Sequence, residues 1–162
     1  NSTKISCRKM SISRLTVTSP FGPITLIEEN GFLVKLEWNK QSNEISNSLL
    51  NEASNQLNAY FSGSLKVFNL PLNPIGTLHQ VKTWKIINEI KYGDYLTYGE
   101  IATNIKSSPR AVGNACGKNP LPIIIPCHRV LTKKLDISGY SGKGGAKTKK
   151  YLLNLEGIDI NT

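Results

Sequence analysis

The spacing of apolar residues changes near the middle of this chain, and that change restricts the possible fold more than any other feature. Before it, short segments rich in β-branched and aromatic residues alternate with turns, which predicts a small antiparallel sheet. After it, apolar residues recur mainly at helical intervals, as they also do over residues 49–61. Pro71, Pro74 and Gly76 form an irregular connection between the two patterns. We therefore expect an α+β fold, in the broad α/β class, with an N-terminal domain over residues 10–75 and a C-terminal domain over residues 76–162.

The N-terminal domain is expected to hold three strands and one helix. The helix is indicated by apolar residues at helical spacing, and Gly63 marks its end. The expected strands are Ile12–Val17, Ile24–Ile27 and Phe32–Trp38. The apolar positions of the helix are Leu49, Leu50, Ala53, Leu57 and Phe61.

Two longer helices are expected to begin and end the C-terminal domain, which is mainly helical. The last runs from about Ala146 to Leu155 and leaves Glu156 at its C-terminal end, where the helix dipole disfavours an anion. A solvated carboxylate accounts for Glu156 without any function, although a charge in a locally unfavourable place also indicates a functional site. The first helix is expected to close at Gly93 and to carry Val81, Trp84, Ile87 and Ile90. The last is expected to bury Tyr151, Leu152 and Leu155.

Between these helices, two short helices joined by a tight turn suggest a helix-turn-helix of winged-helix-like type. Thr97 and Glu100 have the spacing of a capping box, which predicts the start of the first helix, and this helix runs through Ile105. Ser108 is placed to cap the second helix at its N-terminus, and that helix runs to about Lys118.

The second short helix has an unusual composition, with small residues between long polar ones. Small residues permit the close backbone approach that minor-groove binding without base preference requires. They also allow helices to pack tightly against one another, and composition alone does not separate the two explanations. The small residues are Ala111, Gly113, Ala115 and Gly117, and the polar residues, four apart on one face, are Arg110, Asn114 and Lys118.

The charge of the chain indicates a polyanionic partner. Twenty Lys and Arg against eleven Asp and Glu give a net charge of +9, which is typical of nucleic-acid-binding domains but also occurs on merely Lys-rich surfaces. A group of lysines after residue 130 favours a phosphate-facing surface. These are Lys133, Lys134, Lys143, Lys147, Lys149 and Lys150.

The segment Ile125–Val130 places a candidate nucleophile, Cys127, beside a candidate base, His128. The preceding isoleucines and proline predict an extended, buried backbone. Neighbours in an extended segment point to opposite faces, so contact between the two side chains requires a bend or a bridging water. The thiolate is the reactive form of cysteine, and the alternative is an unreactive structural cysteine.

Several ordered motifs resemble the O6-alkylguanine-DNA alkyltransferase family, and the resemblance covers residues 12–158. The segment Ile125–Val130 matches the active-site signature of that family. The chain departs from the family at His79, where an aromatic residue is usual, and at residues 132–137, which lack the usual glycines. The other matching motifs are Ser19–Pro23, Tyr98–Ala102, Arg110–Gly113, Asn119–Pro120, Gly139–Gly142 and Leu155–Gly157.

The resemblance implies a stoichiometric DNA repair reaction. The protein would bind double-stranded DNA in the minor groove, flip out an O6-alkylated guanine and take the alkyl group onto Cys127. O4-alkylthymine is a second candidate base. The thioether formed is stable, so each molecule would act once, and no cofactor is implied. The implied protein is a monomer that does not bind a membrane. Its expected location is the cytoplasm, at the nucleoid of a prokaryote, or the nucleus of a eukaryote.

The resemblance also implies roles for individual residues. His128 would take the thiol proton through a water, Glu156 would orient the imidazole, and Tyr98 would donate a proton or hydrogen bond to the leaving guanine. Arg110 would fill the space in the base stack, although a phosphate contact is the alternative. The residues implied to line the base pocket are Asn119, Val130, Tyr140 and Ser141. Those implied to contact DNA are Arg110, Ala111, Gly113 and Lys118.

Two other functions remain open. A non-catalytic relative that only binds alkylated DNA would replace the cysteine, whereas Cys127 is present here. A cysteine hydrolase using Cys127 and His128 would leave the helix-turn-helix and the positive charge unexplained.

Three widely separated cysteines, Cys7, Cys116 and Cys127, indicate a reducing compartment. With two histidines and no C-x-x-C or H-E-x-x-H motif, no metal site is expected.

Overall fold

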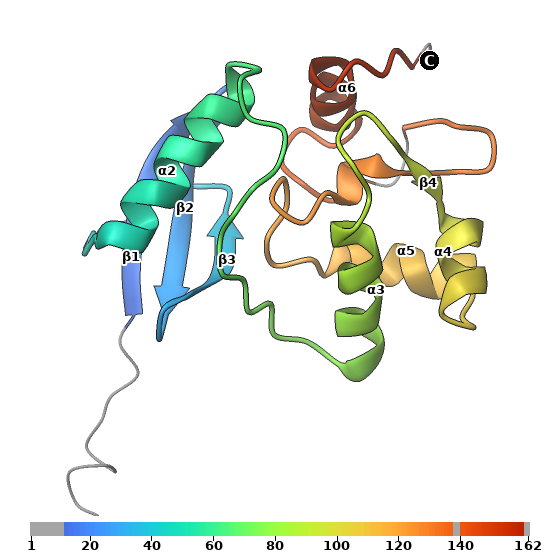
Figure 1. Ribbon diagram of the computed structural model, residues 1–162, viewed down its shortest axis with the longest axis horizontal. Coiled ribbons are helices and arrows are strands. Elements are labelled where there is room, and N and C mark those ends of the chain that lie inside the picture. The colour runs from blue at the N-terminus through green and yellow to red at the C-terminus, as the bar shows by residue number, and fades with distance from the viewer. Residues whose placement is uncertain (1–11, 138–139, 161–162) are drawn as a thin grey trace, which may run out of the picture.

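The computed structural model describes residues 12–137 and 140–160 (Figure 1). Cys7 and Gly139, both named above, lie outside the described residues. The strands are β1 (Ile12–Ser19), β2 (Gly22–Glu29), β3 (Phe32–Glu37), β4 (Leu96–Thr97) and β5 (Val130–Leu131). The helices are α2 (Ser48–Phe61), α3 (Leu78–Asn88), α4 (Tyr98–Asn104), α5 (Pro109–Gly117), α6 (Ala146–Leu155) and the short 3-10 helix η1 (Cys127–Arg129).

The N-terminal part is an antiparallel sheet in the order β1-β2-β3, with α2 lying against it (Figure 1). The three strands occur where the sequence predicts them; β1 and β2 are about two to four residues longer than predicted, and β3 ends one residue earlier. Asn30 and Gly31 connect β2 to β3 with φ of 52° and 86°, the left-handed conformation that a two-residue hairpin turn of type I′ requires. Leu50, Leu57 and Tyr60 of α2 are fully buried. The expected sheet and helix are therefore confirmed.

Helix α3 ends earlier than the sequence predicts. It ends at Asn88, and the next backbone N–H groups bond three residues back, from Glu89 to Ile86 and from Ile90 to Ile87. This tighter turn still buries Ile90, although that residue lies outside the helix. Val81 of this helix is 39% exposed, whereas Trp84 and Ile87 are buried.

Helices α4 and α5 form the expected helix-turn-helix. Thr97 and Glu100 make both hydrogen bonds of the capping box, and the Ser108 hydroxyl accepts from the backbone N–H of Ala111 at 3.1 Å. Strands β4 and β5 pair in parallel, with Leu96 opposite Val130. This pairing places Thr132, which follows β5, beside Tyr98 at the start of α4, and η1 beside the segment before β4.

One hydrophobic core includes residues from both halves of the chain, among them Leu33, Leu57, Trp84 and Leu152. The backbone N–H of Leu36 on β3 donates to the carbonyl of Pro120 at 2.8 Å, which joins the sheet to the segment before η1. The proposed division near residue 75 stays a prediction. Tyr151 of α6 is 42% exposed, so its expected burial is wrong, whereas Leu152 is buried as expected.

Candidate active site

Cys127 lies at the start of a 3-10 turn, not in an extended segment. The backbone N–H of Cys127 donates to the carbonyl of Ile125 at 2.8 Å, and that of Arg129 donates to Pro126 at 2.9 Å. The expectation of an extended backbone at Cys127 is therefore wrong, because these short-range bonds turn the chain after Pro126. Cys127 itself is 5% exposed, as expected for a buried thiol.

The Cys127 thiol is held by a polar contact in a buried environment. The side-chain Nδ2 of Asn119 donates to Cys127 Sγ at 3.1 Å and to the carbonyl of Ile125 at 2.9 Å. A hydrogen bond with the Cys116 thiol and burial raise the pKa of Cys127 well above its ordinary value, against the opposite effects of Asn119 and the Lys149 ammonium. The Cys127 thiol is therefore neutral at rest, and a base would have to remove its proton before it could act as a nucleophile.

Glu156 is buried in a cluster of hydrogen-bond donors. Its Oε2 lies 2.7 Å from His128 Nε2, and Arg129 donates through Nε to Oε1 at 2.7 Å and through Nη2 to Oε2 at 3.0 Å. Burial raises the pKa of Glu156, but the hydrogen bonds and charges of His128 and Arg129 outweigh burial and lower it to about 2. The expectation of a solvated carboxylate is wrong: at 4% exposure, Glu156 is a buried anion paired with Arg129.

His128 is fully buried and has the protonation state of a base. Burial lowers its pKa, as do the charges of Arg129 and Lys149, while Glu156 acts in the opposite direction. An ionised carboxylate only accepts hydrogen bonds, so Nε2 carries the hydrogen that faces Glu156. Nδ1 is then the basic nitrogen, and no described residue hydrogen-bonds to it.

Two contacts to Glu156 were not expected from the sequence. The sequence marks Arg129 only as part of the signature segment, yet Arg129 makes the paired contact with Glu156. Tyr60 of α2, 96 residues away in the chain, donates its hydroxyl to Glu156 Oε2 at 2.5 Å. Tyr60 continues the apolar face of its helix, so the sequence offers no sign that distinguishes it from a core residue.

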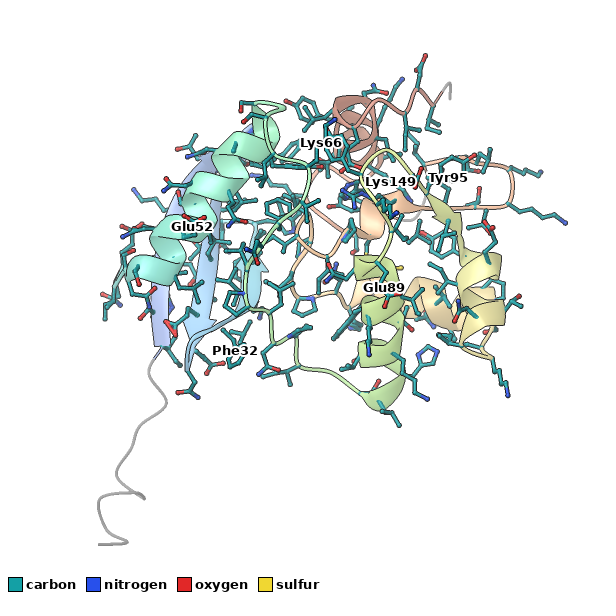
Figure 2. The ribbon with its side chains drawn as sticks, in the orientation of Figure 1. Phe32, Glu52, Lys66, Glu89, Tyr95 and Lys149 are labelled. Carbon is teal, nitrogen blue, oxygen red and sulfur yellow. The ribbon has the colours of Figure 1, made fainter. Side chains whose placement is uncertain are left out.

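Lys149 is the exception in the lysine group. Lys149 belongs to α6 and is fully buried (Figure 2). Its Nζ donates to the carbonyl of Val130 at 2.6 Å and lies 5.7 Å from the centre of the Tyr98 ring. Burial lowers the pKa of Lys149 to about 8, although Cys116, Cys127 and Asp136 nearby act in the opposite direction and raise it. The expectation that it faces phosphate is therefore wrong. Lys133, Lys134, Lys143 and Lys147 are exposed, and Lys150 is partly exposed.

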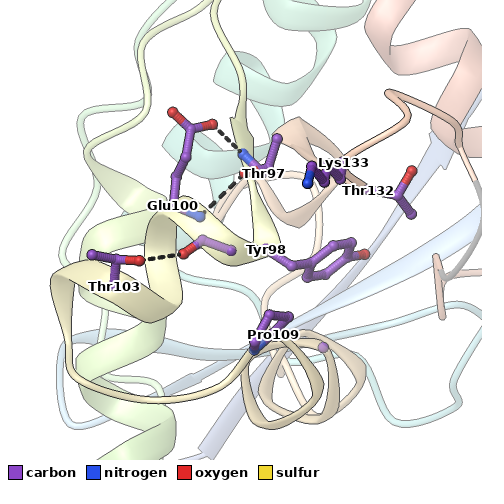
Figure 3. A pocket seen from close by; sticks show the side chains of 9 residues that line it. Thr97, Tyr98, Glu100, Thr103, Pro109, Thr132 and Lys133 are labelled. Atoms are coloured by element: carbon purple, nitrogen blue, oxygen red, sulfur yellow. Dashed lines mark hydrogen bonds between the residues drawn. The ribbon is translucent and has the colours of Figure 1, made fainter.

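Two cavities adjoin these residues. One of about 390 Å³ brings together Cys127, Asn119, Tyr140 and Ser141, with Trp38 of the N-terminal part on its wall. The other, of about 770 Å³, is lined by Tyr98, Thr132 and neighbours from α4 and α5 (Figure 3). Burial raises the pKa of Tyr98, and the thiols of Cys116 and Cys127 add to it, so its hydroxyl stays protonated.

The surface of α5 separates the two explanations for its small residues. Ala115 serves packing, because it is buried and its carbonyl accepts from Trp84 Nε1 at 2.8 Å. A Cβ at Gly117 would meet nothing within 4 Å, and one at Gly113 would touch the Tyr98 ring only at an ordinary 3.9 Å. Packing within the protein therefore does not require glycine at these two positions. Arg110 and Lys118 are exposed on this helix, and Ala111 is partly exposed.

No group of three or more His, Cys, Asp or Glu side chains among residues 12–137 and 140–160 is arranged to hold a metal ion. None of the helices in the described parts of the chain combines the length and hydropathy needed to cross a membrane.

Comparison with known proteins relates both halves of the chain to one family. Residues 13–74 match the 6-O-methylguanine DNA methyltransferase ribonuclease-like domain, and residues 79–158 match the DNA binding domain of the same family. A methylated-DNA–protein-cysteine methyltransferase of Methanosarcina acetivorans is 44% identical over 149 residues, which cover 86% of this chain and 94% of the relative. One of Mycobacterium tuberculosis is 41% identical over 150 residues, covering 87% and 90%.

Solved structures are also similar. A crystal structure of M. tuberculosis O6-methylguanine methyltransferase superposes with a TM-score of 0.80 at 39% identity, covering 90% of this chain and 93% of that one. A structure of M. tuberculosis OGT in complex with DNA gives a TM-score of 0.80 at 39% identity, covering 89% and 92%.

Proposed function

This chain belongs to the 6-O-methylguanine DNA methyltransferase family, and on that premise we propose that it repairs DNA by transferring an alkyl group from O6-alkylguanine to its own Cys127. The observation that carries the proposal is a buried thiol next to a buried His–Glu pair whose histidine is neutral. Curated relatives that are 44% and 41% identical over most of the chain are named as methyltransferases of this kind. The activity is that of a methylated-DNA–protein-cysteine S-methyltransferase.

In the proposed reaction, the Cys127 sulfur attacks the alkyl carbon, a carbon–sulfur bond forms, and the bond from that carbon to guanine O6 breaks. The thiol loses one proton, which His128 accepts at Nδ1 through a bridging water. The leaving guanine gains one proton in exchange. Tyr98, kept protonated by its surroundings, donates a hydrogen bond or that proton to the base. The product is a stable thioether, so each protein molecule reacts once.

The contacts of Glu156 support its proposed role. As an anion it accepts from His128 Nε2, which fixes the tautomer in which Nδ1 is basic. It also stabilises the imidazolium that forms when His128 takes the thiol proton. Arg129 compensates the buried negative charge, which allows an anion to lie at the end of α6.

We propose that duplex DNA lies along α5, with the damaged base turned out of the stack toward Cys127. The pocket for this base would be lined by Asn119, Val130, Tyr140 and Ser141, three of which line the cavity at the thiol. Packing does not require glycine at positions 113 and 117, and this supports the close approach of the DNA backbone at these positions. Arg110, exposed at the start of α5, would occupy the space left in the stack.

Arg110 would alternatively contact a phosphate, and the two roles are separated by experiment below. Ala111, Gly113 and Lys118 would complete the DNA contact. The protein would act as a monomer, without a cofactor or metal, in the cytoplasm or the nucleus. O4-alkylthymine would be a second substrate.

The test is to incubate the protein with duplex DNA containing O6-methylguanine labelled on the methyl group. We expect one mole of label per mole of protein, on Cys127, and no label on Cys127→Ala. DNA binding without label would indicate a lesion-binding protein. Repeated turnover of an ester or amide substrate would instead indicate a cysteine hydrolase.

A further inference from the structure

The hydroxyl of Tyr60 lies inside the buried cluster around Glu156. It donates to Glu156 Oε2 at 2.5 Å, and this same oxygen is 2.7 Å from His128 Nε2. The Tyr60 oxygen is itself 3.5 Å from His128 Nε2. One carboxylate oxygen is therefore shared between a tyrosine of the N-terminal part and the imidazole of the proposed base.

The ring of Tyr60 is packed independently of this hydrogen bond. Its centroid lies 5.6 Å from that of Phe61, 5.2 Å from Phe68 and 6.3 Å from Tyr92. A phenylalanine would make these ring contacts equally well, so packing does not account for the hydroxyl. Burial raises the pKa of Tyr60, as do the charge and hydrogen bond of Glu156, so the hydroxyl remains a donor at any physiological pH.

A hydrogen bond at Oε2 affects the imidazole in two ways. Together with the forked contact from Arg129, it fixes the plane of the Glu156 carboxylate and hence the orientation of His128. It also withdraws negative charge from the oxygen that attracts the imidazole proton. A carboxylate without this donor would hold an imidazolium more tightly, which would leave less of the neutral base.

We propose that Tyr60 is a positioning residue for alkyl transfer, through which the sheet-and-helix part of the chain fixes the Glu156–His128 pair. The inference rests on the proposed function and adds to it a residue of α2 that acts through Glu156.

The test is Tyr60→Phe in the full-length protein, assayed by single-turnover transfer from duplex DNA containing O6-methylguanine over a range of pH. We expect a transfer rate about tenfold lower near neutral pH, because small losses of alignment are costly in a preorganised site. We also expect the acid limb of the rate–pH profile to move to higher pH. The groups facing His128 are Glu156, Arg129, Lys149 and Tyr60, and only the last is changed.

Tyr92→Phe is the matched control. The Tyr92 hydroxyl donates to the carbonyl of Leu155 at 3.0 Å, next to Glu156 in the chain but without touching its carboxylate. We expect the rate and pH profile of Tyr92→Phe to equal those of the wild type. In a double variant with Glu156→Gln, Tyr60→Phe should have little further effect, because it acts through the group already lost.

If Tyr60→Phe does not fold at the assay temperature, 3-fluorotyrosine can be placed at position 60 instead. It keeps the shape of the side chain and makes the hydroxyl a stronger donor. The acid limb of the rate–pH profile should then move to lower pH. A Tyr60→Phe profile equal to that of Tyr92→Phe would overturn the inference and leave the proposed function intact. So would a slower rate with an unmoved acid limb, which indicates lost stability alone. A wild-type protein that takes no label would overturn the proposed function and this inference with it.

Discussion

Replacing Glu156 with glutamine removes the charge at the centre of the site and nearly preserves the shape of the side chain. The carboxylate is 4% exposed and accepts from Tyr60, His128 and Arg129. Holding its pKa at about 2 instead of 4.5 corresponds to roughly 3 kcal/mol of folding free energy, at about 1.36 kcal/mol per pKa unit. We therefore expect Glu156→Gln to lower the free energy of unfolding by roughly 3 kcal/mol near neutral pH, since Arg129 then faces a neutral amide while buried.

The pH dependence of this loss identifies its cause. The folded-state pKa of Glu156 lies below the unfolded value of 4.5, so its stabilisation is present above pH 4.5 and is lost as the pH falls toward about 2. The difference in free energy of unfolding between wild type and Glu156→Gln should shrink over that window. Glu44→Gln is the control, because Glu44 is exposed and accepts one backbone N–H, from Thr16 at 2.9 Å. Its loss should stay below about 1 kcal/mol.

Urea unfolding of the three proteins at several pH values measures the stability effect, and single-turnover transfer measures the effect on the reaction. Loss of the group that orients a catalytic histidine can slow a reaction by up to about 10⁴-fold, so we expect Glu156→Gln to transfer orders of magnitude more slowly with little change in DNA affinity. A stability loss as small as that of Glu44→Gln would refute the buried ion pair. An unchanged transfer rate would refute the role of Glu156 in the relay.

Three further predictions concern the nucleophile, the DNA contact and the buried lysine. Cys127→Ser should lose transfer and keep DNA affinity, whereas Cys116→Ala should still take one label per protein; label on the first variant, or none on the second, would reassign the nucleophile. Arg110→Ala should transfer much more slowly from duplex DNA but only slightly more slowly from free O6-benzylguanine, which needs no flipping. A phosphate contact would instead weaken binding to all DNA alike and reduce the salt slope by about one. The folded-state pKa of Lys149, about 8, lies below its ordinary 10.5, so stability measured for wild type relative to Lys149→Met should rise as the pH increases between these values; a flat difference would show that Lys149 is not desolvated.

Local features of this protein could be predicted from the sequence because their causes lie within a few residues. The capping residues Thr97 and Ser108 bond to N–H groups three positions ahead, and any chain with that spacing can form the same bonds. The first three strands follow from their β-branched and aromatic residues and from the turns between them, such as that at Asn30–Gly31. The family resemblance implies a pocket lined by Asn119, Val130, Tyr140 and Ser141; all of these except Val130 line the cavity at Cys127.

Predictions for single charged side chains were wrong where the partners lie far away in the chain. A lysine within a group of lysines is expected to be exposed. Lys149 is buried instead, where its ammonium group donates to the Val130 carbonyl and lies near the Tyr98 ring.

The sequence predicts an extended backbone at Cys127, because isoleucine and proline favour that conformation locally. The bonds to Ile125 and Pro126 turn it instead.

The sequence by itself determined the first three strands, the main helices and the helix-turn-helix, since each depends on composition, periodicity or capping, and it predicts Cys127 as the nucleophile from a contiguous motif. Only the tertiary structure decided the state of Glu156. The same local sequence at the end of α6 suits a solvated carboxylate or a buried one. The choice depends on Arg129 and His128, 27 and 28 residues away, and on Tyr60, 96 residues away. Burying a charge is unfavourable unless donors converge on it, and convergence of donors from two other segments, α2 and η1, is a property of the folded chain.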